Sequence, residues 1–129
     1  VIMRMQKTFR DMVKKEGTFI APDDFSEVID NGKAFIDPGV KMGEGWLLTG
    51  EVVSLIKSGV TNVISAQPFG CLPNHIVAKG MVRKIKDEYP KANIVAIDYD
   101  PSASKVNQEN RIRLMLANAK LSEEMKASI

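Results

Sequence analysis

The chain has 129 residues, of which 44% are hydrophobic and 26% are charged, proportions typical of one globular domain with a real core. Its 18 basic and 16 acidic residues are mixed along the chain and leave a net charge of +2. This mixing is typical of solvated helix faces and argues against nucleic acid as a partner. No apolar run approaches the ~20 residues of a membrane span, so a membrane is not expected as a partner either.

The chain contains a single cysteine, Cys71. One cysteine excludes an internal disulfide and fits a reducing compartment, so we expect a cytoplasmic protein. It also excludes a metal site built entirely from cysteines of this chain. The sequence begins at Val1 inside an apolar helical pattern. We therefore expect residues 1–129 to be a single α/β domain excised from a longer polypeptide.

Apolar residues at helical spacing predict five helices. The first covers residues 2–15 and ends at Gly17, and the second opens at Pro22. Residues 1–42 are thus expected to be a helical lead-in, and residues 43–121 an α/β core that bears the motifs. Within that core, helices are predicted over residues 46–57, over residues 74–89, and from Ser102 onward. The residues expected to face inward on the third and fifth helices are Leu48, Val52, Leu55, Ile56, Val106, Leu114, Ala117 and Leu121.

Two short apolar runs, Asn62–Ala66 and Ile94–Ile97, predict strands that are covered on both faces. A helix connects them, so the strands are expected to be parallel with a right-handed crossover. Two strands do not make a stable sheet alone. Either a third strand lies near Ala34–Ile36, or the other strands belong to the longer polypeptide. The predicted fold is a three-layer α/β fragment: a parallel strand–helix–strand unit flanked by several helices.

Cys71 lies between the first predicted strand and the fourth predicted helix, for which Asn74 is a good N-cap. This is the edge at which open α/β sheets bind ligands. Helix N–H groups favour the thiolate form of the cysteine, which is both the nucleophile and the metal ligand. The alternative interpretation is that Cys71 is a small buried hydrophobic residue.

Three more residues are candidates for the same edge. His75 could serve as a base for Cys71, although no third group is available to orient the pair. Asp98 and Asp100 follow the second strand and could bind a ribose, a metal or a water, or simply form the turn before a helix. We expect one concave site between the two strand ends, with Asn74 and His75 at its rim. No residue is assigned a catalytic role.

Four ordered segments resemble the carboxyl-terminal region of a known family, the acyl-CoA dehydratase activase-related proteins. These are also called CoA-substrate-specific enzyme activases and are linked to the activator of 2-hydroxyglutaryl-CoA dehydratase. The first 40 residues carry no corresponding motif. The four segments are GEGWLLTGE at 43–51, QPFGCLPNHI at 67–76, AIDYDP at 96–101 and VNQENRI at 106–112.

The resemblance implies an anaerobic, cytoplasmic iron–sulfur system of electron transfer in 2-hydroxyacyl-CoA metabolism. The order of elements is also similar to the carboxyl-terminal part of 2-hydroxyacyl-CoA dehydratase subunits. A cysteine of this loop helps to hold a [4Fe–4S] cluster there, which implies that Cys71 is one cluster ligand. The activator's nucleotide-binding loops have no counterpart in this chain, so ATP hydrolysis is not expected.

A cubane cluster needs about four ligands, and this chain supplies one cysteine. We expect the others to come from the remainder of the longer polypeptide or from a dehydratase-like partner, and no cluster to form in the isolated chain. Two other functions stay open. The chain could be an enzyme domain that uses Cys71 or the Asp98/Asp100 edge on a CoA thioester, or a purely structural docking domain.

Overall fold

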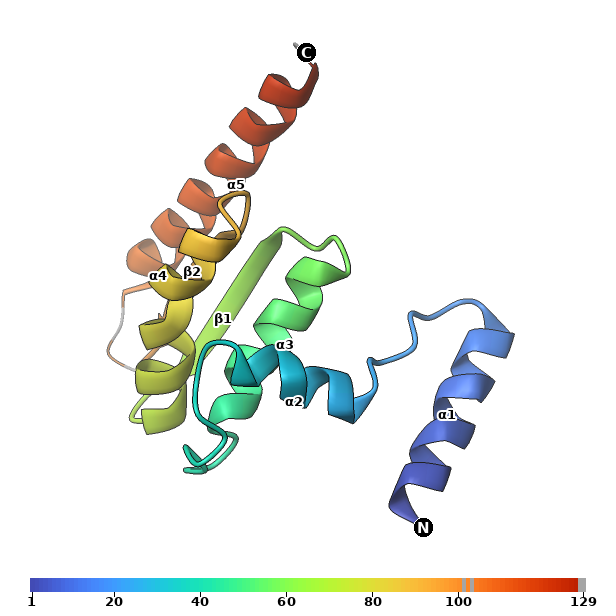
Figure 1. Ribbon diagram of the computed structural model, residues 1–129. Helices are drawn as coiled ribbons and strands as arrows, with labels where there is room; N and C mark the ends of the chain where they lie inside the picture. The colour runs from blue at the N-terminus through green and yellow to red at the C-terminus, as the bar shows by residue number, and fades with distance from the viewer. Residues whose placement is uncertain (101, 103, 128–129) are drawn as a thin grey trace.

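The computed structural model describes residues 1–100, 102 and 104–127 and has a mixed α/β fold, as predicted (Figure 1). The elements of the described residues follow one another in an order that sets two strands between helices. They are α1 (Ile2–Glu16), α2 (Phe25–Lys33), α3 (Trp46–Lys57), β1 (Asn62–Pro68), the π-helix η1 (Pro73–Ala78), α4 (Lys79–Glu88), β2 (Asn93–Tyr99) and α5 (Lys105–Ala127).

Strands β1 and β2 form a parallel pair, which confirms the predicted pairing. Their register runs from Asn62 opposite Asn93 to Pro68 opposite Tyr99, so both strands extend two residues beyond their predicted ends. The residues described here contain no third strand. Of the two alternatives, a third strand near residues 34–36 is wrong, because the main-chain N–H groups of Phe35 and Ile36 both bond to the carbonyl of Gly32 and close the end of α2.

The core lies on one face of the sheet, beneath α3 and α4. Ile85 of α4 is only 1% exposed and packs against residues of both strands, with Met81 and Val82 beside it, as the helical spacing predicted. Helix α5 packs against β2. In Figure 1 α4 lies in front of β2 and α5 behind it, which makes three layers at this strand. The fully packed cluster comprises Phe35, Val53, Ile56, Val63, Ile85, Ala92 and Ile94.

Two predicted inward faces differ from the structure. On α5, Leu114 is 60% exposed and Met115 is buried instead, while Val106, Ala117 and Leu121 are exposed as well. A two-stranded sheet is narrow, so α5 contacts it along a thin strip and most of its apolar residues stay outside. On α3, Leu55 is exposed and Val53 is buried.

The lead-in helix α1 stands apart from the rest of the chain in Figure 1. The structure describes all its residues, and none is buried. An ion pair of 2.7 Å joins Arg10 of α1 to Asp24. Helix α2 begins at Phe25, later than predicted from Pro22, because the Asp24 carboxylate accepts the main-chain N–H of Ser26 and caps the helix there. Among the described helices, none has the length and apolar character needed to cross a bilayer.

Candidate ligand-binding site

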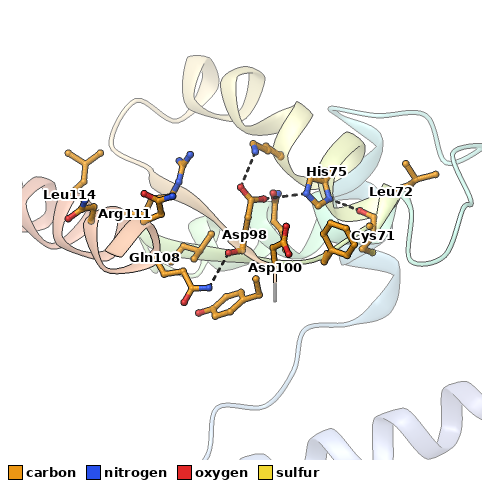
Figure 2. Close-up of a pocket in the computed structure, with 16 residues that line it drawn as sticks. Cys71, Leu72, His75, Asp98, Asp100, Gln108, Arg111 and Leu114 are labelled. Atoms are coloured by element: carbon orange, nitrogen blue, oxygen red, sulfur yellow. Dashed lines mark hydrogen bonds and ion pairs between the residues drawn. The ribbon is translucent and has the colours of Figure 1, made fainter. Parts of the chain in front are cut away.

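A cavity of about 870 Å³ lies at the carboxyl ends of β1 and β2 (Figure 2). The two strand ends, the loop before η1 and the first turns of α5 line this open cavity. Because the strands are parallel and adjacent, their ends meet at one edge of the sheet, and four of the predicted candidates line the cavity there: Cys71, His75, Asp98 and Asp100. The lining includes Gln67, Cys71, His75, Lys79, Asp98, Asp100 and Arg111.

The turn between β1 and η1 holds the cysteine at this edge. Gly70 has φ 71°, a left-handed conformation that glycine adopts without steric cost. The main-chain N–H of Phe69 then bonds to the carbonyl of Tyr99, and that of Cys71 bonds to the carbonyl of Pro68. The cysteine is thus tied to the ends of both strands.

Asn74 does not cap the helix, contrary to the prediction. The residue before η1 is Leu72, which already has helical dihedral angles, so Asn74 falls inside the first turn. It is buried and lies outside the cavity lining, contrary to the expected rim position. Its side-chain amide instead donates a hydrogen bond of 3.0 Å to the sulfur of Cys71. A thiolate accepts such a bond more strongly than a thiol does.

His75 connects the cysteine loop to β2. Its Nδ1 atom lies 2.8 Å from the main-chain oxygen of Cys71, and its Nε2 atom lies 3.3 Å from Oδ1 of Asp98. Because a carbonyl oxygen only accepts, Nδ1 carries the proton in the first contact. The imidazole therefore bonds to the main chain of the cysteine, and the geometry gives no support to a pair of thiol nucleophile and imidazole base.

The Asp98 carboxylate has two differently placed oxygens. Its Oδ2 atom lies 3.5 Å from the ammonium of Lys79. Its Oδ1 atom is buried and, despite the ion-pair distance to His75, has no aligned hydrogen-bond donor among the described residues. The side chain as a whole is 39% exposed, so one oxygen faces inward while the other remains near solvent.

Asp100 has the simpler environment of a turn residue. Its carboxylate accepts bonds of 2.8 Å from both the main-chain N–H and the hydroxyl of Ser102. These two bonds hold the pKa of Asp100 below its usual value, and the main-chain bond has the larger effect. The arrangement agrees with the interpretation of Asp100 as a turn residue before α5, although the residue also lines the cavity.

Gln67 lies at the end of β1 and was not among the predicted site residues. Its side chain is fully buried, its amide nitrogen donates to the carbonyl of Asn74 at 3.0 Å, and its Oε1 atom has no partner among the described residues. The alternation of Val63, Ser65 and Gln67 on one strand face was the available signal, since it places a polar amide where a core residue is expected.

A scan against protein-family models finds no match, and neither a curated protein nor a solved structure is significantly similar to the chain. Within the described residues, no group of three or more histidine, cysteine or acidic side chains is placed to hold a metal ion.

Proposed function

We propose that this chain is an iron–sulfur module of an acyl-CoA dehydratase activase-related protein, acting in cytoplasmic, anaerobic 2-hydroxyacyl-CoA metabolism. In this proposal Cys71 is one ligand of a [4Fe–4S] cluster. The observation that carries it is the position of a half-buried thiol on a cavity at the carboxyl ends of parallel strands. The four sequence segments that resemble the family support it, since three of them contribute residues to this cavity.

The residues present fit one corner of a cluster. Thiolates are the usual ligands of iron–sulfur clusters, and hydrogen bonds to the sulfur adjust the reduction potential. The Asn74 amide makes such a bond to Cys71. The remaining ligands would come from the rest of the longer polypeptide or from a dehydratase-like partner. When bound, the cluster would supply one-electron transfer.

The neighbouring residues position the cysteine. His75 bonds to the main chain of Cys71, Asp98 lies within ion-pair distance of His75, and Lys79 lies within ion-pair distance of Asp98. These contacts connect the loop to β2 and to the first turn of α4. The sulfur is therefore held in place before any ligand binds.

Exposed apolar side chains on part of the surface support the proposal that this chain belongs to a larger assembly. Ile64 of β1 is 49% exposed, and Phe69 and Leu114 are 71% and 60% exposed. Ile64 lies on the β1 face opposite the α3–α4 core, and the described residues cover only about half of it. We propose that the remainder of the longer polypeptide covers this face, as the docking interpretation also expects.

A cluster reconstitution tests the proposal. The full-length polypeptide and its Cys71→Ser variant would be incubated anaerobically with iron and sulfide, and bound iron, sulfide and visible absorbance would be measured. Leu72→Ser is the matched control, because it places the same side chain one residue later. We expect loss or strong change of the cluster in Cys71→Ser alone. Equal cluster content and spectra in all three proteins would remove Cys71 from the ligands.

A further inference from the structure

Two buried oxygen acceptors belong to residues that lie opposite each other on β1 and β2. Gln67 and Asp98 are register partners on β1 and β2, so their side chains leave the same face of the sheet. Gln67 is fully buried, and both its Oε1 atom and the Oδ1 atom of Asp98 lack a hydrogen-bond donor within the described part of the chain. Both residues line the cavity.

These two oxygen atoms each need a hydrogen-bond donor. A buried acceptor without a donor is destabilising, and most buried polar atoms in native proteins have a partner. His75 does not provide one when its ring is neutral, because its proton is on Nδ1, toward the carbonyl of Cys71. The missing donor is therefore expected from something that enters the cavity.

The charges around the pair indicate what kind of donor fits. The ammonium of Lys79 already lies 3.5 Å from Oδ2 of Asp98, so a further cation is disfavoured. Neutral hydroxyl groups have no such penalty. Neighbouring parallel strands are about 4.8 Å apart, which allows two adjacent hydroxyls of one sugar ring to donate to one acceptor each.

A cationic side chain of α5 lines the same cavity. Arg111 of α5 lines it and makes no ion pair among the described residues, whereas Arg113 on the same helix lies 3.7 Å from Glu109. In Figure 2 the Arg111 guanidinium lies on the same side as the Asp98 carboxylate. A guanidinium matches the geometry of a phosphate group with two parallel hydrogen bonds.

We propose that this cavity binds a phosphorylated sugar. Two adjacent hydroxyls donate to Oε1 of Gln67 and Oδ1 of Asp98, and the phosphate binds Arg111. The volume of about 870 Å³ is within the range of small-molecule sites. Tyr99 and Phe69, both exposed and both in the lining, offer aromatic surface for a base if the sugar belongs to a nucleotide. The proposal does not depend on a cluster at Cys71.

Calorimetric titration of this chain, without iron, tests the proposal with four probes. They are ribose 5-phosphate, 2-deoxyribose 5-phosphate, adenosine 5′-monophosphate and inorganic phosphate. We expect ribose 5-phosphate to bind about tenfold more tightly than its deoxy analogue, which lacks adjacent hydroxyls. If adenosine 5′-monophosphate binds more tightly than ribose 5-phosphate, the ligand is a nucleotide. If it binds equally or more weakly, the ligand is a free sugar phosphate.

Two variants examine the two halves of the site. Arg111→Gln should weaken ribose 5-phosphate binding about tenfold, while Arg113→Gln, on the same helix but outside the cavity, leaves it unchanged. Gln67→Met should reduce the preference for the adjacent hydroxyls, with circular dichroism to verify folding. If that variant unfolds, the comparison of ribose and deoxyribose phosphates still decides. Absence of binding at millimolar concentration, or equal affinity for all four probes, overturns the proposal.

Discussion

The Nδ1 atom of His75 lies 2.8 Å from the main-chain oxygen of Cys71, whereas it is the amide of Asn74 that reaches the cysteine sulfur. The two consecutive residues thus contact different parts of the cysteine. His75 bonds to its main chain, and Asn74 donates a hydrogen bond to its side chain. Asn74 is therefore the residue whose side chain contacts the sulfur of Cys71.

Asn74→Ala should slow alkylation of Cys71 by iodoacetamide at neutral pH by roughly tenfold, because a hydrogen bond to a charged atom contributes about 1.5 kcal/mol or more. Alkylation rates of wild type and variant, measured in the folded state and in urea, check this. In the unfolded proteins, where the hydrogen bond from Asn74 is absent, the two rates should be equal. Asn118→Ala, an exposed asparagine on α5, is the control and should behave as wild type. Equal alkylation rates in the folded wild type and the folded Asn74→Ala variant would contradict this role of the hydrogen bond.

Asp24 should make the unfolding free energy of the protein depend on pH in the acidic range. Hydrogen bonds from the hydroxyl and the main-chain N–H of Ser26, with the Arg10 guanidinium, hold the pKa of Asp24 below its ordinary value of 3.8. A lowered pKa in the folded state stabilises the fold fully above the unfolded-state value, and this stabilisation is lost as the pH falls through the lower folded-state value.

Asp24→Asn isolates this effect, because asparagine also caps helices well but carries no charge. Unfolding by urea, followed from neutral pH down to about pH 2, gives the difference in unfolding free energy between wild type and variant. Wild type should be the more stable protein at neutral pH, with the advantage disappearing in acid. A difference that stays constant with pH would contradict the assigned role of the carboxylate.

Ile85→Ala tests whether α4 packs on the sheet as described. Ile85 is 1% exposed within the main core cluster, so the variant should lose about 2–5 kcal/mol of unfolding free energy. Leu116→Ala on α5 is the matched control. That leucine is 62% exposed, and its truncation should change stability by less than about 0.5 kcal/mol. Similar losses of unfolding free energy in both variants would contradict the placement of Ile85 in the core.

Gly45→Ala tests the loop that leads into α3. Gly45 has φ 49°, and an added Cβ atom would clash with the carbonyl oxygen of Val40. We expect a loss of at least about 1–3 kcal/mol from the strained backbone, with the clash added to it. Gly59→Ala is the comparison, since Gly59 also has positive φ but open space around its Cβ position. Gly59→Ala should lower the thermal unfolding temperature less than Gly45→Ala does.

The local pattern of the sequence was sufficient for most elements. Residues 46–57 were predicted as a helix and form α3 over that range, and the two apolar runs became the parallel strands. The position of Cys71 between β1 and the next helix was predicted from the same spacing. These features follow from short-range periodicity, because the spacing of apolar residues decides which face of an element is buried.

The tertiary structure decided the features that depend on distant residues. The narrow sheet left Leu114 outside and buried Met115, which the periodicity of α5 does not reveal. The strand register set Gln67 beside Asp98, and the packing of α5 on β2 brought Arg111 to the same cavity. The sequence by itself determined the elements and the edge at which Cys71 lies. Which side chains meet at that edge was decided by long-range packing, because they come from separate elements whose relative placement no local pattern encodes.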